Sequence, residues 1–247
     1  MRKQVSFAVV IPARLASRRL PGKVLLKETG KYLIQHVWER LRDLKTARAV
    51  IIATDSPEVE LAARSFGAQV RMTSPHHPSG TDRVAEVARD LEVEVVVNVQ
   101  GDEPTIHCGD IERLIEPFAE DPELPMATLA RRRTDAEAHS NPNLVKVVTD
   151  LRGRALYFSR APIPTARTSP VAWLHHVGVY AYRRSFLLKL GSLEPTPLEG
   201  LERLEQLRVL EHGYAIQVVE TENLYEGIDT PEQYRAFVEA YRRGQVG

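Results

Sequence analysis

The sequence predicts an α/β protein with a Rossmann-like, three-layer fold and a mostly parallel, mixed sheet. In the first hundred residues, short apolar runs alternate with segments whose apolar residues recur at helical spacing. Strands that are apolar along their whole length are typical of parallel sheets with both faces covered. Beyond about residue 130 this alternation is lost, and we expect a smaller subregion that shares the same core.

The first half repeats a unit of strand, loop and helix. Apolar runs predict buried strands at 5–11, 49–53, 69–72 and 93–99. Helical spacing predicts helices that begin near Leu33, at Pro57 after Ser56, and after Thr81. Alternation of this kind favours a parallel sheet.

The second half mixes short strands with helices. Strands at 145–149 and 155–158 flank 150–153, which is typical of a hairpin connection. A strand at 174–182 and a helix at 198–211 follow, and Thr230-Pro231-Glu232-Gln233 has the pattern of a capping box that opens the last helix. We expect one domain, 1–247, with a nucleotide-binding part of about 1–130, a substrate-facing part of about 131–215 and a return to the core over 216–247.

The composition excludes several classes of protein. Because 33 Lys and Arg balance 33 Asp and Glu, no overall field draws the chain to nucleic acid or to an anionic membrane. No apolar run approaches the roughly 20 residues that cross a bilayer, and the run 7–11 ends too early, at Pro12, for a signal peptide. A single cysteine, Cys108, excludes an internal disulfide and favours a reduced, cytoplasmic compartment.

A basic loop follows the first strand. Residues 14–23 carry several cations, among them Arg14 and Lys23, at the edge of a parallel sheet where ligands bind. Arginine offers forked donors and lysine a point charge, and together they suit a triphosphate. A solvated basic loop is the alternative. The loop is not a P-loop, because the first glycine of that motif is absent and Val24 replaces its hydroxyl residue; a G-x-G-x-x-G fingerprint is also absent.

Two aspartates are candidate ligands of a divalent metal. Asp102 follows the strand at 93–99 and is expected at the same sheet edge as the basic loop, while Asp229 precedes the last helix. Mg²⁺ binds through one or two carboxylates together with phosphate oxygens. A solvated turn aspartate and a helix cap are the alternatives. Ser79 and Gly80 begin a helix whose backbone N–H groups suit phosphate or carbonyl oxygens, although Ser79 can equally be an ordinary N-cap.

Together these segments resemble the 3-deoxy-manno-octulosonate cytidylyltransferases, also called CMP-Kdo synthetases, over nearly the whole chain. The resemblance rests on several motifs that occur in the same order. They are Ile11-Pro12-Ala13-Arg14 with Arg19-Leu20-Pro21-Gly22-Lys23, His77-Pro78-Ser79-Gly80-Thr81-Asp82-Arg83, Val97-Asn98-Val99-Gln100-Gly101-Asp102-Glu103-Pro104, Asn141-Pro142-Asn143, Ala155-Leu156-Tyr157-Phe158-Ser159-Arg160, His176-Val177-Gly178-Val179-Tyr180 and Leu204-Glu205-Gln206-Leu207-Arg208.

The resemblance implies transfer of CMP from CTP to the anomeric hydroxyl of 3-deoxy-D-manno-octulosonate (Kdo), with release of pyrophosphate, for lipopolysaccharide biosynthesis. It also implies a homodimer and Mg²⁺ held by Asp102 and Asp229. Arg14, Lys23 and Asp102 would be the catalytic residues. The nucleotide would be bound by Arg14, Lys23, Ser79, Gly80, Arg83 and Gln100, and the sugar by Gln100, Arg160, His176, Tyr180, Glu205 and Gln206. This chemistry depends on positioning and charge stabilisation and needs no covalent nucleophile.

Two departures and three rival functions remain. Glu226 stands where a small or hydroxylated residue is expected, and the loop 164–174 is short.

The nearest rival is a cytidylyltransferase for a related acidic sugar, such as 8-amino-Kdo or a sialic acid. A metal-dependent glycosyltransferase should carry an Asp-x-Asp motif, whereas the chain has Asp102-Glu103-Pro104. A sensor or scaffold without turnover should lack the metal carboxylates or the phosphate cations.

Overall fold

The computed structural model describes residues 5–17, 19–165, 167, 172–223, 225 and 227–246. The chain forms two compact units. The first, here the N-terminal unit, comprises Ser6–Ile111 and Leu224–Gly247; the second, here the central unit, comprises Met1–Val5 and Glu112–Asn223. The chain thus passes between the units after Val5, inside helix α4 (Cys108–Glu120) and again after Asn223. These divisions fall at different positions from the part boundaries near 130 and 215 expected from the sequence.

The N-terminal unit contains a parallel sheet in the order β3-β2-β1-β4. Its strands are β1 (Phe7–Ala13), β2 (Val50–Thr54), β3 (Gln69–Met72) and β4 (Val95–Asn98). All residues of β1 and β4 are buried, as their unbroken apolar runs predict. The four strands predicted in the first half are therefore confirmed as strands, with ends that differ by a few residues.

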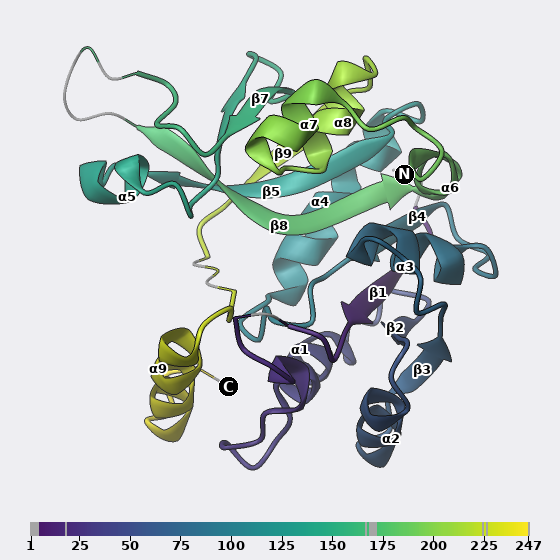
Figure 1. Cartoon of the computed structure of the whole chain (residues 1–247). Coiled ribbons are helices and arrows are strands. Elements are labelled where there is room, and N and C mark those ends of the chain that lie inside the picture. The colour runs from purple at the N-terminus through teal and green to yellow at the C-terminus, as the bar shows by residue number, and fades with distance from the viewer. Residues whose placement is uncertain are drawn as a thin grey trace. The chain divides into compact units, whose positions relative to one another are not determined.

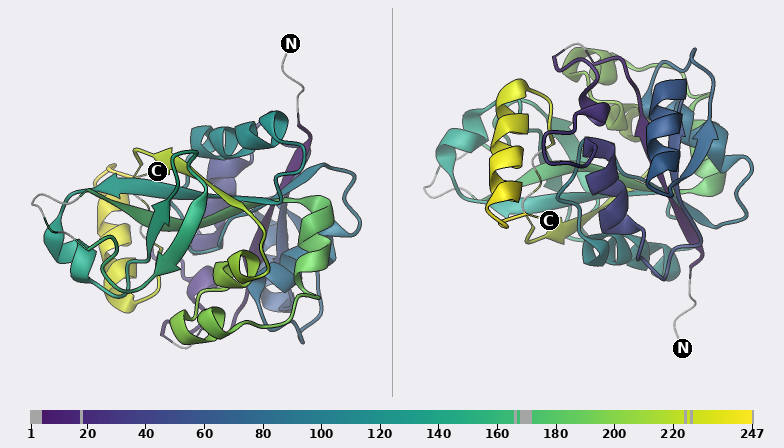
Figure 2. Two further views of the ribbon diagram at one scale, coloured as in Figure 1. Left: turned by 90° about the horizontal axis from the view of Figure 1, so that it is seen from above. Right: turned by 90° about the horizontal axis from the view of Figure 1, so that it is seen from below.

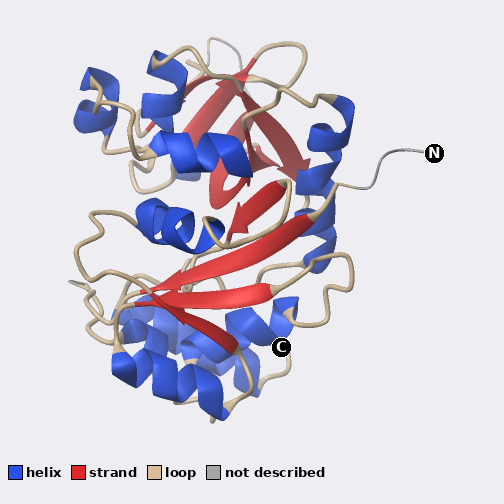
Figure 3. Cartoon of the chain, turned by 90° about the vertical axis from the view of Figure 1, so that its right-hand side faces the viewer, coloured by secondary structure: helices blue, strands red, loops and turns tan. Residues whose placement is uncertain are grey.

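The helices of this unit cover both faces of the sheet. Helices α1 (Leu33–Leu41) and α2 (Pro57–Ser65) lie on one face and α3 (Gly80–Ala88) on the other (Figures 1 and 3). Right-handed crossovers explain this arrangement, because the chain moves outward from β1 to β3 and then returns past β1 to β4. The direction reverses between β1 and β4, and a reversal of this kind opens a crevice at the carboxyl ends of the two strands.

The last helix, α9 (Pro231–Arg242), lies beside α1 in the N-terminal unit (Figure 2). Leu33 of α1 and Phe237 of α9 belong to one buried apolar cluster. The predicted capping box is confirmed: the Thr230 hydroxyl accepts from the backbone N–H of Gln233, and the Gln233 side chain accepts from the N–H of Thr230. The C-terminal segment therefore joins the unit that contains the first strands.

The central unit is built around β5 (Met126–Arg133), which pairs antiparallel with β8 (Trp173–Arg183) and parallel with β9 (Ile216–Thr221). Strand β6 (Lys146–Thr149) pairs with β8 and with β7 (Ala155–Ser159). The predicted hairpin at 150–153 is confirmed, and Gly153 adopts a φ of 75° in its turn. The unit also contains the short helices α5 (Ala136–Ser140), α6 (Arg184–Leu190), α7 (Pro197–Glu202) and α8 (Gln206–Glu211).

One helix predicted from the sequence is wrong in its extent. The segment 198–211 forms two helices, α7 and α8, because Arg203 adopts a left-handed conformation with a φ of 54° and ends α7. Helices α4, α5 and α6 and strands β5 and β9 were not predicted. In the part of the chain that the structure describes, no helix is long and apolar enough to span a membrane.

Replacement of Ser56 by alanine should destabilise the N-terminal unit. The Ser56 side chain caps α2 by accepting from the backbone N–H of Val59 at 3.3 Å, and that N–H would otherwise be buried without a partner. We expect Ser56→Ala to lower the free energy of unfolding by about 1 kcal/mol, measured by urea unfolding. Ser56→Thr keeps the oxygen and is the matched control; equal losses in both variants would contradict the capping role.

Candidate active site

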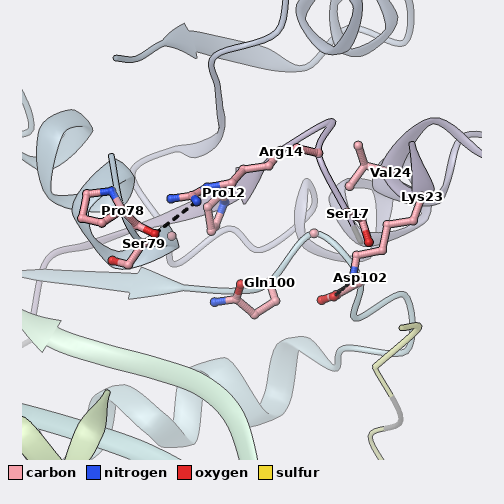
Figure 4. A pocket seen from close by; sticks show the side chains of 12 residues that line it. Pro12, Arg14, Ser17, Lys23, Val24, Pro78, Ser79, Gln100 and Asp102 are labelled. Atoms are coloured by element: carbon pink, nitrogen blue, oxygen red, sulfur yellow. Dashed lines mark hydrogen bonds and ion pairs between the residues drawn. The ribbon is translucent and has the colours of Figure 1, made fainter. Parts of the chain in front are cut away.

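A pocket of about 300 Å³ lies at the carboxyl ends of β1 and β4, where the strand order reverses (Figure 4). Its position is the one at which open parallel sheets bind ligands. The lining includes Arg14, Lys23, Ser79, Gly80, Gln100 and Asp102, all predicted from the sequence as site residues. The structure therefore brings the basic loop, the start of α3 and the loop after β4 to one place.

Arg14 connects the basic loop to the segment before α3. It directly follows β1, and its guanidinium donates hydrogen bonds to the carbonyl oxygens of His77 at 3.0 Å and Pro78 at 3.3 Å. These contacts hold a cation beside the helix N-terminus, where negative charge is favoured. An anion in the pocket would thus meet a guanidinium and the first backbone N–H groups of α3 together.

The start of α3 is a regular capped N-terminus. Ser79 is the N-cap, and its hydroxyl accepts from the backbone N–H of Asp82 at 3.1 Å, so the N-cap alternative for Ser79 is confirmed. The next residue, Gly80, lies where an added Cβ would be 3.5 Å from Pro12 and 3.8 Å from the Gln100 amide oxygen. A side chain at this position would take up room in the pocket.

Lys23 lies between two carboxylates from distant parts of the chain. Its ammonium forms ion pairs with Asp102 and, at 2.9 Å, with Asp229, and it also donates to the carbonyl oxygen of Ile228 at 3.2 Å. Burial alone lowers the pKa of Lys23, but the two carboxylates together outweigh it, so the pKa is raised and the side chain is charged. Arg19 adds a second cation, 2.7 Å from Asp229.

The donor set formed by Asp102 and Asp229 fits Mg²⁺. Both carboxylates contact the same ammonium group and are therefore close enough to share one cation. Mg²⁺ commonly binds one or two carboxylates and keeps several waters. Burial, reinforced by the two aspartates, raises the pKa of neighbouring Glu103 to about 8.

The backbone after β4 approaches its neighbours closely. An added Cβ at Gly101 would be 2.9 Å from a side-chain carbon of Ile34 and 3.1 Å from the carbonyl oxygen of Pro12. The backbone oxygen cannot move without disturbing β1, so the loop that presents Asp102 requires glycine here. Gln100 donates from its amide to the Asn98 side chain at 3.1 Å, and Figure 4 shows it between Ser79 and Asp102.

Arg83 is not brought to the pocket. It was predicted to bind the nucleotide, but its side chain is completely buried and contacts Thr73 and, at 2.9 Å, Asp55. The helical position explains this, because Arg83 lies on the same face of α3 as the buried residue Val87, four positions later. Arg83 therefore connects α3 to the residues that follow β2 and β3. Its position does not support direct contact with a nucleotide.

Four residues predicted to bind the sugar form a cluster in the central unit. His176 and Tyr180 of β8 have ring centroids 5.5 Å apart, and the Tyr180 hydroxyl donates to the Gln206 amide oxygen at 3.4 Å. Tyr180 and Gln206 also line a small cavity together with Glu205. Burial lowers the pKa of His176 to about 3, with His175 adding to the effect, and burial raises the pKa of Tyr180. His176 and Tyr180 are therefore both neutral near pH 7.

Arg160 is held by a network that sequence reasoning missed. Its guanidinium donates to the carbonyl oxygens of Glu202 at 2.9 Å and Pro142 at 3.2 Å, and the Glu202 carboxylate accepts from the backbone N–H of Arg160. Lys146 is fully buried and donates to the carbonyl oxygens of Asn141, Leu144 and Arg160 at 2.7 to 2.8 Å. A charged residue inside the apolar run at 145–149 was the available signal for this network, because buried lysine needs fixed acceptors.

Comparisons with known proteins agree with this fold and site. A family profile described as cytidylyltransferase matches residues 8–221. The 3-deoxy-manno-octulosonate cytidylyltransferase of Syntrophotalea carbinolica is 47% identical, over 97% of this chain and 100% of its own. That of Solibacter usitatus is 51% identical, over 90% of this chain and 89% of its own.

Solved structures give the same result. A structure described as CMP:2-keto-3-deoxy-manno-octonic acid synthetase complexed with CTP is 43% identical and has a TM-score of 0.92, over 97% of this chain and 99% of that one. A cytidylyltransferase from Leptospira borgpetersenii, 18% identical with a TM-score of 0.67, shares the fold.

The fold and the pocket at its strand reversal thus define an α/β enzyme of the nucleotidyltransferase class. Within that class, the chain belongs to the cytidylyltransferase family and to its 3-deoxy-manno-octulosonate cytidylyltransferases. The predicted fold class and the family resemblance are both confirmed. The individual site residues stay predictions, and Glu226, one of the noted departures, lies outside the described residues together with part of the loop 164–174.

Acid should destabilise the chain partly through His176. Its folded pKa of about 3 lies below the ordinary value of 6.5, so between these pH values the unfolded chain binds a proton that the folded chain does not. Stability is therefore lost as the pH falls through this window, by roughly 1.4 kcal/mol per pH unit well below 6.5. His176→Gln should show a flatter decline than the wild type when urea unfolding is followed from pH 7 to 4. Parallel declines would contradict a buried neutral His176.

Proposed function

We propose that this chain transfers CMP from CTP to the anomeric hydroxyl of Kdo and releases pyrophosphate. The observation that carries the proposal is the likeness, over 97% of the chain, to a CMP:2-keto-3-deoxy-manno-octonic acid synthetase solved with CTP. The relatives that match nearly full length have the corresponding activity in their names. The pocket of the N-terminal unit supports it, because cations and paired carboxylates meet there at a ligand-binding edge of the sheet.

The reaction needs charge stabilisation on the nucleotide side. The anomeric hydroxyl attacks the α-phosphorus of CTP, the bond to the bridging oxygen of the β-phosphate breaks, and the hydroxyl loses its proton. Arg14 and Lys23 would hold the triphosphate and stabilise negative charge on the departing pyrophosphate. Gly80 and the N-terminus of α3 would donate hydrogen bonds from backbone N–H groups to phosphate or base oxygens. None of these steps requires a covalent nucleophile.

Mg²⁺ is part of the proposal, with Asp102 and Asp229 as its protein ligands. When bound, the ion would neutralise phosphate charge and orient the triphosphate. Lys23, which contacts both carboxylates, would keep them in place before the ion and the nucleotide bind. The ammonium group can then turn toward phosphate oxygens, since a lysine side chain is flexible and its charge is retained.

The sugar-binding residues of the proposal are Gln100, Arg160, His176, Tyr180, Glu205 and Gln206. Arg160 would bind the carboxylate, because a guanidinium offers two parallel donors to a carboxylate. The remaining groups are hydrogen-bonding residues suited to hydroxyls. Within the central unit, the clustering of His176, Glu205 and Gln206 around Tyr180 supports a shared role for these four residues.

Turnover would be tested by pyrophosphate release from purified protein with Mg²⁺, each nucleoside triphosphate in turn, and Kdo, 8-amino-Kdo or sialic acid. We expect release with CTP and Kdo. In Asp102→Ala the rate of release should fall by at least about 100-fold, because the bound metal lowers the activation barrier by several kcal/mol. Asp90→Ala, an exposed aspartate after α3, is the matched control.

Each outcome of this assay has a distinct meaning. Release with a different sugar alone would keep the chemistry and overturn the substrate. Release that survives in Asp102→Ala would overturn the metal site. Absence of release with every pair would overturn the proposed function and favour a glycosyltransferase or a sensor.

The proposal also includes a homodimer that acts in the cytoplasm in lipopolysaccharide biosynthesis. Large apolar side chains support a second copy as partner: in the central unit, Leu156 of β7 is 63% exposed and Leu201 of α7 is 80% exposed. We expect twice the chain mass in light scattering, and a shift toward the monomer in Leu156→Glu. Leu61, 75% exposed on α2 of the N-terminal unit, is the control position. A monomeric mass for the wild type would contradict the dimer.

A further inference from the structure

Thr128 of β5 contacts His176 of β8 inside the central unit. Thr128 is completely buried, and its hydroxyl oxygen lies 3.0 Å from Nε2 of His176. The same oxygen lies 2.9 Å from the carbonyl oxygen of Val179 and 3.2 Å from that of Val177. One hydroxyl group therefore meets an imidazole nitrogen and two carbonyl oxygens.

A β-bulge creates this arrangement. Thr128 lies opposite Tyr180, but the next residue of β5, Leu129, lies opposite Val177, so two residues of β8 have no partner on β5. Bulges disrupt the ladder locally and redirect neighbouring side chains. The Thr128 hydroxyl compensates for the disruption, since it bonds to carbonyl oxygens of the bulged segment.

The positions of the protons follow from the partners. A threonine hydroxyl has one proton to donate and can also accept, whereas a carbonyl oxygen can only accept. When the Thr128 proton points to the carbonyl oxygen of Val179 or Val177, the hydroxyl oxygen is left as an acceptor for His176. Nε2 of His176 must then carry a proton, and in the neutral imidazole Nδ1 is an acceptor. Burial keeps the ring neutral, because it lowers the pKa of His176 to about 3.

Among the described residues, His176 and its neighbour Gln206 each have a side-chain nitrogen without a hydrogen-bond partner. Among the described residues, Nδ1 has no hydrogen-bond partner in the protein, and the ring packs against Phe158 and Tyr180. A second unpartnered group lies in the same cluster: the Gln206 side chain is 3% exposed, and its amide nitrogen is buried without a partner. An acceptor and a donor are thus both available, as a sugar hydroxyl requires.

We propose that Thr128 is a positioning residue that holds His176 as the Nε2–H tautomer, so that Nδ1 accepts a hydrogen bond from a hydroxyl of the acidic sugar. The inference rests on the proposed function for its ligand, but its statement about the tautomer does not. Thr128 would thus belong to the sugar site without contacting the sugar. In this arrangement Nε2 of His176 donates a hydrogen bond to Thr128, and Nδ1 accepts one from the ligand.

The tautomer would be measured on the intact wild-type protein by NMR of ¹⁵N-histidine-labelled chain at neutral pH. Long-range proton–nitrogen correlations distinguish a protonated from an unprotonated ring nitrogen, and the His176 signals would be assigned by their loss in His176→Gln. We expect a protonated Nε2 and an unprotonated Nδ1. A protonated Nδ1, or a charged ring, would overturn the proposal without any need for a folded variant at position 128.

Two variants at position 128 separate the hydroxyl from its packing. Thr128→Val keeps the shape and removes the hydroxyl, and Thr128→Ser keeps the hydroxyl. With the sugar varied at saturating CTP, we expect Thr128→Val to raise the KM for Kdo by about threefold to tenfold, with the KM for CTP unchanged. Thr128→Ser should restore the KM for Kdo, and the His176 signals of Thr128→Val should show a changed tautomer population.

The remaining outcomes are decisive as well. Equal KM values for Kdo in Thr128→Val and the wild type would overturn the positioning role, as would equal increases in the KM values for Kdo and CTP. If no acidic sugar is turned over by the wild type, the proposed function fails. The NMR result then still decides whether Thr128 sets the tautomer of His176.

Discussion

The ion cluster at Lys23 holds the candidate active site together. Asp102 follows β4 and Asp229 precedes α9, and without a cation two carboxylates brought this close would repel each other. The ammonium of Lys23 removes that repulsion and, because it also bonds to the backbone before Asp229, ties the C-terminal segment to the start of the sheet. The same electrostatic demand explains why this place suits a divalent metal, since only a cation can hold both aspartates ionised side by side.

In the central unit, polar side chains are buried without a compensating charge. His176 is neutral because of burial, and its Nε2 lies 3.0 Å from the Thr128 hydroxyl oxygen. Lys146 is buried as well, and three carbonyl oxygens surround its ammonium. Hydrogen bonds of this kind favour one arrangement of a core, because a slip of a strand would break them. The candidate sugar residues therefore rest on a rigid framework.

The sequence predicted the parallel sheet well and the site in part, for identifiable reasons. A short segment rich in valine, such as 93–99, favours a buried strand. Loops after parallel strands meet at one edge of the sheet, so Arg14 and Asp102 could be placed together. Arg83 could not be placed, because a motif does not reveal that one arginine faces the sheet with Asp55 as its partner. Thr128 gave no signal at all: its role depends on a shift in strand register, which arises only when β5 and β8 pair.

The contrast between Arg160 and His176 bears on how an acidic sugar could be recognised. Such a sugar carries one carboxylate and several hydroxyls, and a site with several mobile cations could bind the carboxylate in more than one orientation. In the central unit Arg160 is fixed by carbonyl oxygens, whereas the buried His176 cannot hold a proton on both nitrogens near neutral pH. A neutral ring with a set tautomer distinguishes a hydroxyl, which can donate, from a carboxylate, which can only accept. On the proposed function, desolvation of His176 thus contributes to the orientation of the sugar together with the charge of Arg160.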